Sequence, residues 1–305
     1  MPIVSIVTAT YNRSNVLRHA IASVRRQTVT NWELLVIGDG CTDDTDTVVA
    51  SFGDPRIRFE NLPRNHGEQS LPNNHGAALA TGRYLAFLNH DDLWFSDHLD
   101  ALIGALDGAG ADLAYGLSAR VDATGQVHLW GDSPGGVYRL WQPVPASLWL
   151  MRRDLFERVG PWRSASTLWD SPSQEWLRRA AATGATLRPV NRLTTVQITS
   201  GGRRNSYASR AEAEHSAMVR AMDDEAAGRE QLLTAIAAGS SAMTTATRPL
   251  LLAGRALRAL VTRGCAAVGV PPTALVNAVR FGRKGGFIRH LRRTRGLAPA
   301  IGDGQ

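Results

Sequence analysis

The sequence predicts an α/β protein with a mostly parallel β-sheet, helices on both faces of that sheet, and a helical C-terminal extension. Residues 1–120 alternate short apolar runs with segments of helical apolar spacing. This alternation is typical of parallel sheets, because consecutive parallel strands are joined by crossover helices. Apolar residues make up 44% of the 305-residue chain, which is enough to bury a sizeable core. From residue 209 onward the pattern is helical throughout.

The first 120 residues are expected to hold five strands with helices between them. The expected strands cover residues 3–8, 33–37, 57–61, 84–88 and 112–115. The first expected helix begins at Ser14, and the second runs from Thr42 or Asp43 to about residue 52. The third follows a Gly- and Asn-rich loop and ends near residue 80, and the fourth runs from Ser96 to about residue 106. Ser14 and Ser96 are expected to act as N-caps.

The rest of the chain is expected to be mixed and then helical. The expected elements are a hairpin over 121–130 with its turn at 123–125, a strand and a helix over 148–159, and a helix over 173–183. Pro249, Pro271 and Pro272 are expected to interrupt the later helices. We place a boundary near residue 240, between a domain of residues 1–240 and an extension of residues 241–305.

The positive charge of the chain is concentrated in this extension. Residues 241–305 carry eleven arginines and lysines and one acid, whereas residues 1–240 carry 23 basic and 26 acidic residues. A basic face over the whole chain would have indicated nucleic acid as a partner, and the extension has few aromatic residues to stack on bases. The charge distribution therefore argues against nucleic-acid binding.

Cysteine usage and the N-terminus bear on the compartment. Cys41 and Cys265 cannot form a disulfide framework and lack zinc-site spacing, which indicates a reducing interior. The N-terminus lacks the basic region and cleavage site of a secretory signal, and no run approaches the ~20 apolar residues that span a bilayer. We therefore expect a soluble, cytoplasmic protein.

The loops after the expected strands are the places to look for a binding site, because ligands of such sheets bind beyond the carboxyl ends of the strands. In the loop of residues 89–94, Asp91 and Asp92 follow Asn89 and His90. Carboxylates in this position can hold a divalent cation that bridges to phosphates. Helix capping by an aspartate at a strand–helix junction is the alternative.

Two other loops carry polar side chains. Asp39 follows an expected buried strand, lies in a turn between two glycines, and could accept hydrogen bonds from a nucleobase or a ribose. The alternative is an ordinary Asp-Gly turn before a helix whose first turn is rich in acids. In the loop of residues 9–13, Tyr11 could stack on a nucleobase and Arg13 could meet a phosphate. A plain surface turn is the alternative there.

Taken together, four motifs in order resemble the family-2 glycosyltransferases, whose nucleotide-sugar-binding fold is called GT-A. The motifs are VSIVTATYNR at the first strand, IGDGCTDDT where the family usually has Asp-Asp-Gly-Ser, NNHGAALATGRY for its Asn-x-Gly helix, and LNHDDLW for its Asp-x-Asp element. The resemblance runs from residue 2 to about residue 195.

The resemblance implies a role for individual residues. Asp39 would bind the nucleobase beside Tyr11, Asp91 would hold Mg²⁺ or Mn²⁺ on the donor pyrophosphate, and Glu175 would deprotonate the acceptor. The residues expected at the nucleotide-sugar site are Ala9, Thr10, Tyr11, Arg13, Asp39, Asn74, Asn89, His90, Arg203 and Arg204, the last two as a lid over the pyrophosphate. The alternative for Glu175 is an exposed helical acid that pairs with Arg178 or Arg179.

The sequence departs from the family pattern at three positions. Gly38 and Asn89 each replace an acid, and Glu175 stands where aspartate is commoner. The lost charge at Asn89 is expected to weaken metal binding. Gly38 and Asn89 also leave room for a non-catalytic nucleotide-sugar-binding protein. A nucleotidyltransferase is disfavoured, because the first loop, ATYNR, has no glycine to wrap a triphosphate.

The expected function is therefore an inverting glycosyltransferase that moves a hexosyl or related group from a nucleotide-diphosphate sugar to an acceptor hydroxyl. The expected acceptor is a glycan or glycolipid of cell-surface polysaccharide, glycolipid or glycoconjugate biosynthesis. In the extension, residues 248–295 mix apolar residues with arginines at helical spacing. Such a segment can lie on the anionic inner face of the cell membrane, or it can pack as a helical cap on the catalytic domain with its arginines in solvent.

Overall fold

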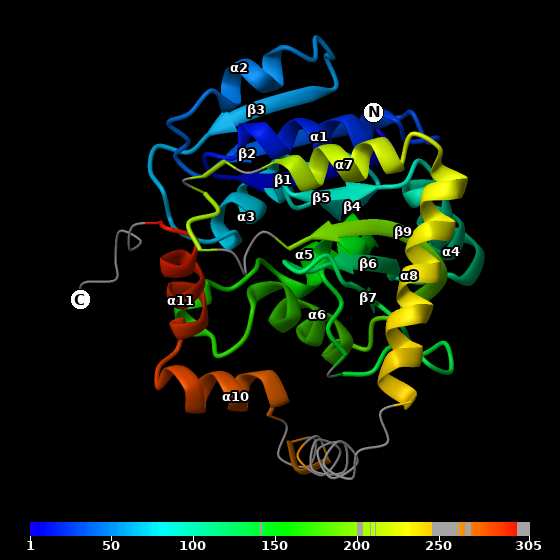
Figure 1. Cartoon of the computed structure of the whole chain (residues 1–305). Coiled ribbons are helices and arrows are strands. Elements are labelled where there is room, and N and C mark those ends of the chain that lie inside the picture. Colours follow the sequence, from blue (N-terminus) through cyan, green and yellow to red (C-terminus); the bar gives the residue numbers. More distant parts are fainter. Residues whose placement is uncertain are drawn as a thin grey trace.

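The computed structural model describes residues 1–140, 142–199, 204–207, 209–210, 212–245, 261, 263–265 and 270–297, without the side chains of residues 240–245. One nine-stranded sheet runs through the molecule in the order β3-β2-β1-β4-β8-β6-β9-β5, and β7 pairs with β6 off this path (Figure 1). The strands are β1 (Val4–Thr10), β2 (Trp32–Gly38), β3 (Ile57–Asn61), β4 (Tyr84–Phe87), β5 (Asp92–Trp94), β6 (Leu113–Val121), β7 (Val127–Trp130), β8 (Trp149–Arg152) and β9 (Leu187–Ile198).

Helices cover both faces of the sheet. They are α1 (Ser14–Arg25), α2 (Thr45–Ala50), α3 (Ser70–Leu79), α4 (His98–Ala109), α5 (Arg153–Val159), α6 (Pro172–Ala182), α7 (Ala213–Ala221), α8 (Glu225–Thr245), α10 (Pro272–Phe281) and α11 (Gly286–Thr294), with short 3-10 turns η1 (Ala146–Leu148) and η2 (Ala165–Thr167). None of the helices in the described part of the chain is long and apolar enough to cross a membrane.

The direction of the strands brings several carboxyl ends to one edge. β3, β2, β1 and β4 are parallel to one another. β8 runs antiparallel to both β4 and β6, so β6 points the same way as β4. The α/β class with a parallel sheet segment and helices on both faces is confirmed. The loops that follow β1, β2 and β4 therefore meet at the same edge.

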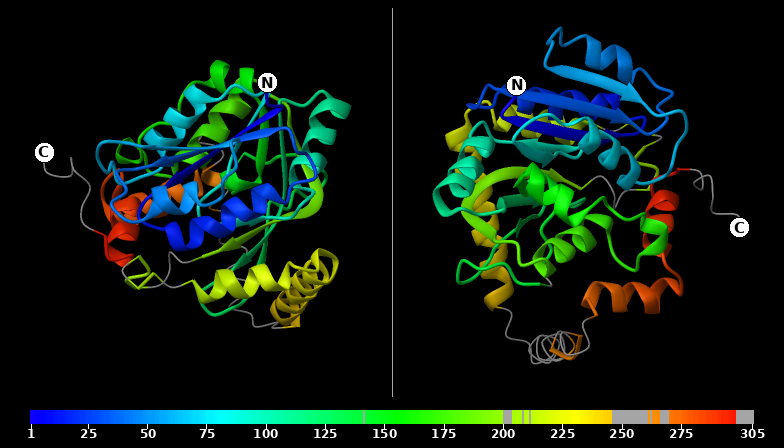
Figure 2. Two further views of the ribbon diagram at one scale, coloured as in Figure 1. Left: turned by 90° about the horizontal axis from the view of Figure 1, so that it is seen from above. Right: turned by 180° about the vertical axis from the view of Figure 1, so that it is seen from behind.

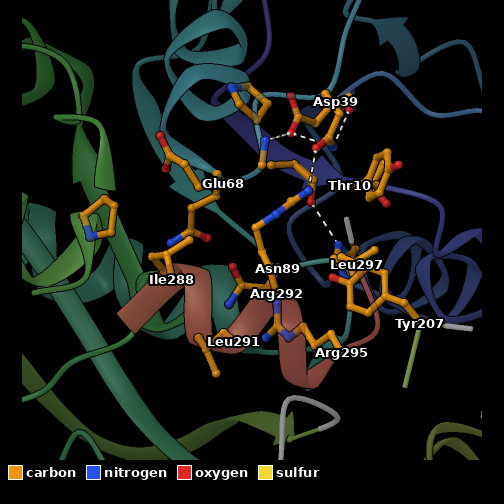
Figure 3. A pocket seen from close by; sticks show the side chains of 18 of the residues that line it. Thr10, Asp39, Glu68, Asn89, Tyr207, Ile288, Leu291, Arg292, Arg295 and Leu297 are labelled. Atoms are coloured by element: carbon orange, nitrogen blue, oxygen red, sulfur yellow. Dashed lines mark hydrogen bonds between the residues drawn. The ribbon is translucent and has the colours of Figure 1, made fainter. Parts of the chain in front are cut away.

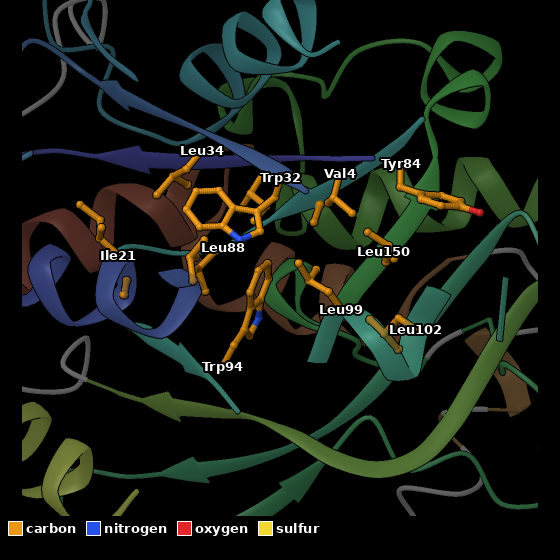
Figure 4. Packing of buried hydrophobic residues seen from close by; sticks show 14 of the residues in the cluster. Val4, Ile21, Trp32, Leu34, Tyr84, Leu88, Trp94, Leu99, Leu102 and Leu150 are labelled. Carbon is orange, nitrogen blue, oxygen red and sulfur yellow. The ribbon is translucent and has the colours of Figure 1, made fainter. Parts of the chain in front are cut away.

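Alternating side chains build one core on each face of the parallel strands. Val4 and Ile6 of β1 pack toward α1 and α4, whereas Val7 packs toward α3 and α6. Figure 4 shows the first of these clusters, in which Trp32 and Trp94 lie among aliphatic side chains. Side chains of a strand point alternately to opposite faces, so both faces are apolar where helices cover them.

A third cluster lies under the second half of the sheet. Leu117 of β6 and Val196 of β9 pack there against Met222, which follows α7, and Leu232 of α8. Figure 2 shows α7 and α8 together on this side of the sheet. The strand β9 was not predicted, because Pro189 and the surrounding charged residues break the apolar alternation that identifies strands.

The two expected serine N-caps form other contacts instead. Ser14 Oγ donates to Asp44 Oδ1 at 2.6 Å, and Ser96 Oγ donates to Glu225 Oε2 at 2.6 Å. Each serine therefore joins two elements that are distant in sequence, and neither caps its helix by a side-chain hydrogen bond. The two serines therefore indicated correctly where the helices lie, but the predicted hydrogen-bond partners of the serines were wrong.

The C-terminal segment returns to the carboxyl edge of the sheet. Pro272 begins α10, as the proline pattern predicts, whereas Pro249 lies outside the described residues. Helix α11 then packs beside the body of the molecule, where Gly285 N donates to Leu168 O at 2.8 Å (Figures 1 and 2). The predicted boundary at residue 240 falls inside α8, which continues to Thr245.

Candidate active site

A pocket of about 270 Å³ lies at the carboxyl edge of the sheet (Figure 3). Its walls are the loops after β1, β2 and β4, the segment before α3, the start of α6, and helix α11. The predicted site residues that line it are Ala9, Thr10, Tyr11, Asp39, Asn89, His90 and Asp91. The structure thus brings three of the four sequence motifs together, as the common direction of their strands requires.

Asp39 is buried at the end of β2, with 4% of its surface exposed. Its carboxylate accepts hydrogen bonds from the backbone amides of His66 at 2.9 Å and Gly67 at 3.0 Å, and from Asn65 Nδ2 at 3.1 Å. These contacts tie the segment before α3 to the sheet edge. Asp39 therefore already orders one wall of the pocket through its own hydrogen bonds.

Gly38, one of the departures from the family pattern, lies against Asn61 of β3. A Cβ atom at Gly38 would lie 2.5 Å from Asn61 Oδ1, so a side chain there would require Asn61 to move. Asn61 holds the turn in this position, because its Oδ1 accepts from Cys41 N at 2.8 Å and its Nδ2 donates to Cys41 O at 2.9 Å. A residue larger than glycine at position 38 would therefore disturb these two bonds.

Asp91 and Asp92 have different environments. Asp92 is buried, and its Oδ2 accepts from Ser147 Oγ at 2.5 Å and from Asn89 Nδ2 at 2.8 Å. Burial and the nearby Asp91 charge raise the pKa of Asp92 to about 7. Asp92 thus joins the loop to the core, and Asp91 is the carboxylate that lines the pocket.

Cationic and ionisable side chains surround Asp91. They are His90, Arg295, His215 and Arg13. Burial acts to raise the pKa of the Asp91 carboxyl, but these neighbours together bring it below its ordinary value. Asp91 is therefore an ionised acid in a partly desolvated pocket. Such a group can bind a cation or a ligand donor more strongly than an acid in open solvent.

His90 lies at the base of the pocket in its neutral form, because burial lowers its pKa. Its Nδ1 lies 3.2 Å from Ala9 O, and its Nε2 lies 3.4 Å from the Tyr207 hydroxyl. The carbonyl can only accept, so Nδ1 carries the proton and Nε2 is the acceptor. His90 thereby connects the loop after β1 to the segment that precedes α7.

The residues around Asp91 fit a divalent ion only if a ligand supplies further oxygens. The side chains of Asn89 and Asp92 bind each other. Among the described residues there is no group of three His, Cys, Asp or Glu side chains that could hold an ion. Mg²⁺ is often bound by one or two carboxylates together with substrate phosphates. Asp91 suits that arrangement, whereas a site made of protein ligands alone does not form here.

Arg13 is fully buried behind the pocket rather than in its lining. Its Nη1 donates to Ser206 O at 2.7 Å, and its guanidinium lies 5.0 Å from the Tyr207 ring centre. Its Nε and Nη2 have no hydrogen-bond partner among the residues that the structure describes. Arg13 therefore contributes charge close to Asp91 and supports Tyr207.

Four predicted site residues that the structure describes do not line the pocket: Arg13, Asn74, Arg204 and Glu175. Asn74 holds Trp162 through two hydrogen bonds, Nδ2 to Trp162 O at 2.9 Å and Trp162 N to Oδ1 at 2.8 Å, and lines a neighbouring cavity. Arg204 is exposed and lies away from the pocket lining. Arg203 falls outside the described residues.

Glu175 lies one helical turn beyond the pocket wall that Ser171 and Pro172 form. Its carboxylate is 13% exposed and forms ion pairs with Arg179 Nε at 2.9 Å and Arg163 Nη1 at 3.1 Å. The pairing with Arg179 is the alternative that the helical spacing predicts. Its role as a base stays a prediction.

Sequence reasoning missed several residues of the pocket. Glu68 lines it, and burial raises the pKa of its carboxyl. Tyr207, Arg292 and Arg295 also line it, together with apolar side chains of α11. The one available signal was the basic amphipathic pattern at residues 280–295, which predicts an amphipathic helix without saying what it packs against.

Residues 5–147 match the family described as Glycosyl transferase family 2. An Escherichia coli UDP-Glc:alpha-D-GlcNAc-diphosphoundecaprenol beta-1,3-glucosyltransferase is 35% identical over 37% of this chain and 45% of its own length. The succinoglycan biosynthesis protein ExoO of Rhizobium meliloti is 37% identical over 37% of this chain and 32% of its own. The chain spans less than half the length of these curated relatives.

Among solved structures, the chain resembles S. aureus TarS 1-349 in complex with UDP-GlcNAc. The two chains share 17% of their residues, the TM-score is 0.55, and the match covers 69% of this chain and 61% of TarS 1-349. At this identity the likeness shows the fold alone. It covers a larger share of the chain than residues 5–147, which match the family.

Proposed function

We propose that this chain, whose residues 5–147 match glycosyltransferase family 2, is a glycosyltransferase that transfers a sugar from a nucleotide-diphosphate sugar to a hydroxyl of a glycan or glycolipid, with inversion. The observation that carries the proposal is that Tyr11, Asp39 and Asp91, from three separate strand ends, line one pocket. Relatives named for diphosphoundecaprenol-linked glucosyl transfer and succinoglycan biosynthesis support a role in cell-surface polysaccharide or glycolipid biosynthesis.

The nucleobase end of the donor would lie beside Tyr11 and Asp39. Tyr11 is partly exposed and supplies an aromatic face. Asp39 holds the 65–67 segment in place through backbone amides, so the wall on this side is formed before the ligand arrives. A preformed wall lowers the ordering cost of binding.

The diphosphate end would lie near Asp91. We propose that Mg²⁺ or Mn²⁺ binds there between Asp91 and the donor phosphates and offsets the charge of the departing nucleotide diphosphate. The guanidinium groups of Arg295 and Arg13 favour the ionised form of Asp91, which is the state that a cation requires. His90 and Asp92 hold the loop that presents Asp91, through Ala9 O and Ser147 Oγ respectively.

For the acceptor end we retain Glu175 as the proposed general base. The N-terminal turn of α6 reaches the pocket, and the Glu175 carboxylate one turn further would act there after exchanging its partners Arg163 and Arg179. A positioned base contributes ~10²–10⁴-fold. Glu175→Gln should therefore reduce transfer or donor hydrolysis by at least about 100-fold without weakening donor binding. Glu68→Gln is the comparison, because Glu68 is the pocket acid with a raised pKa. If only Glu68→Gln reduced turnover, the role would pass to Glu68.

A thermal-shift panel tests the proposed donor site. UDP-, GDP-, dTDP- and CMP-sugars would be added to the full chain with and without Mn²⁺. A ligand at a hundred times its Kd adds ~2.7 kcal/mol to stability. We expect a shift for one nucleotide that increases with Mn²⁺ and is lost in Asp91→Asn, with the exposed Asp100→Asn as the matched control. Mn²⁺ alone should produce no shift, because the protein offers it one carboxylate. Absence of a shift with every donor would contradict the proposal.

Peripheral membrane contact through α10 is part of the proposed function. Leu275, Val276 and Val279 are 43%, 57% and 82% exposed, and Arg280 and Arg283 lie next to this apolar face. Apolar side chains beside arginines suit an anionic bilayer surface. We expect the chain to co-sediment with vesicles that contain phosphatidylglycerol at low salt, and Val276→Ser with Val279→Ser to weaken this binding. Equal sedimentation of both proteins would contradict it.

A further inference from the structure

Helix α11 forms a complete wall of the pocket, although it lies more than 130 residues beyond the family match. Ile288, Leu291, Arg292 and Arg295 line the pocket and follow helical spacing, so they share one face of the helix. Figure 3 shows Arg292 and Arg295 extending from this helix into the pocket. The wall therefore presents two guanidinium groups to the pocket, of which Arg295 is the one near Asp91.

The other walls of the pocket are acidic. Asp39, Glu68 and Asp91 line it, and each would repel a diphosphate. Among the described residues of the lining, Arg292 and Arg295 are the only arginines or lysines. Guanidinium groups match the geometry of phosphate oxygens and remain charged at all physiological pH values. A diphosphate in this pocket would thus meet its cationic partners on α11.

Both side chains are already positioned. Arg292 is 8% exposed, and its Nη2 donates to Asn65 Oδ1 at 3.1 Å, while Asn65 Nδ2 donates to Asp39. The Arg295 guanidinium lies 5.6 Å from the Tyr207 ring centre, and its buried Nε has no hydrogen-bond partner among the residues that the structure describes. Backbone contacts add to this, because Tyr207 N donates to Arg295 O.

We propose that Arg292 and Arg295 bind the diphosphate of the nucleotide-sugar donor, so that the C-terminal extension completes the donor site. This inference rests on the proposed function and assigns to α11 the arginine side chains that the described residues of the other walls do not supply to the pocket lining. Arg292 also links this subsite to the nucleobase end through Asn65 and Asp39. Arg295 lies near Asp91 and would offset charge on the leaving group from the opposite wall.

Isothermal titration of the full chain tests the proposal. The probes are UDP, GDP and dTDP, each compared with its nucleoside, in Mg²⁺ and in EDTA. Hydrogen bonds to charged groups contribute ~1.5–3 kcal/mol, so Arg292→Gln and Arg295→Gln should each lower affinity for the preferred diphosphate by about tenfold or more. Affinity for the nucleoside should stay within about twofold. Arg293→Gln, on the exposed side of the same helix, is the matched control and should bind as the wild type does.

The outcomes separate this inference from the proposed function. If the wild type binds a nucleoside diphosphate and both variants bind it equally well, the arginine subsite is wrong and the donor site stands. If a variant loses affinity for the nucleoside and the diphosphate alike, α11 acts only as a wall and the inference is also overturned. A wild type that binds no nucleoside diphosphate would overturn both. Arg295→Lys should recover part of the lost affinity, since it restores the charge without the fork of donors.

Discussion

The two walls of the pocket are held in place by different kinds of contact. The sheet-edge wall consists of loops that leave β1, β2 and β4, and the backbone register of these parallel strands fixes where each loop begins. The α11 wall reaches the same pocket from the far end of the chain. It is attached through contacts such as Gly285 N to Leu168 O, Asn205 N to Thr294 O, and Arg292 Nη2 to Asn65 Oδ1.

The difference has a consequence for binding. Residues at the sheet edge sit on buried strands, so moving them would disturb the core, whereas α11 could shift while the sheet stays folded. For a ligand that contacts both walls, the sheet-edge wall would fix the orientation and the α11 wall would add affinity. Substitutions at the sheet edge should therefore change stability and binding together, and substitutions that displace α11 should change binding alone.

The largest effect is expected from Asp39→Ala, at the sheet-edge wall. The substitution leaves the backbone amides of His66 and Gly67 without their acceptor, whereas Asn65 Nδ2 keeps its bond to the Asp39 carbonyl. Each buried donor without a partner costs ~1–3 kcal/mol, so we expect the free energy of unfolding to fall by about 3 kcal/mol or more. Nucleotide binding should be lost in the same variant.

Urea unfolding and titration with UDP or GDP would measure these two effects. Asp46→Ala is the control, because Asp46 is an exposed acid on the nearby helix α2. A variant at Asp39 with normal stability and normal nucleotide affinity would show that the sheet-edge wall does not depend on this carboxylate. The proposal that substitutions at the sheet-edge wall change stability and binding together would then be wrong.

An intermediate effect is expected from acid, again in the sheet region. His98 is buried, its ring stacks 4.2 Å from Trp94, and burial lowers its pKa from 6.5 to about 3. The unfolded chain binds this proton below pH 6.5 and the folded chain does not, so stability is present above pH 6.5 and is lost as pH falls toward 3. The loss should reach about 2 kcal/mol at pH 5.

His98→Asn should remove this part of the acid sensitivity, whereas His128→Asn, at a half-exposed histidine, should keep it. The measurement is urea unfolding at pH 5 and pH 7 for the three proteins. Equal pH dependence in the wild type and His98→Asn would show that the buried imidazole does not limit the stability of the sheet.

The sheet-edge wall could be predicted from the sequence because its signals are local. The strands expected at residues 57–61 and 84–88 reappear as β3 and β4. The polar residues that follow the strands reach the pocket, as Tyr11, Asp39 and Asp91 show. A strand followed by a polar loop can be recognised from the residues of that segment alone. The parallel direction of the strands then brings the loops together.

The α11 wall could not be predicted in the same way. The spacing of Arg292 and Arg295 predicts one face of a helix, but the face that a helix buries depends on what lies beside it. Of the two expectations for the extension, packing on the catalytic domain is seen for α11, whose Arg292 and Arg295 point into a pocket rather than into solvent. Ser14 and Ser96 illustrate the same limit, because their partners Asp44 and Glu225 are distant in sequence.

The smallest effect is expected from substitutions at two glycines that precede α11. These substitutions also separate the two walls most clearly. Gly282 and Gly285 both have positive φ angles, of +66° and +70°, so alanine costs a similar backbone strain of ~1 kcal/mol at each. A Cβ atom at Gly285 would lie 2.9 Å from Ser166 Cα, whereas at Gly282 it would meet nothing within 4 Å.

Gly285→Ala should therefore push α11 away from η2, and Gly282→Ala should leave it in place. We expect Gly285→Ala to bind UDP or GDP about tenfold more weakly than Gly282→Ala, at the level of one lost arginine contact, with equal unfolding free energies for the two proteins. Because the strain is matched, any difference in binding reports the position of α11. If the two variants bound nucleotide equally, the second wall would not contribute to affinity. If Gly285→Ala were also much less stable, α11 would belong to the cooperative core and the two walls would be one unit.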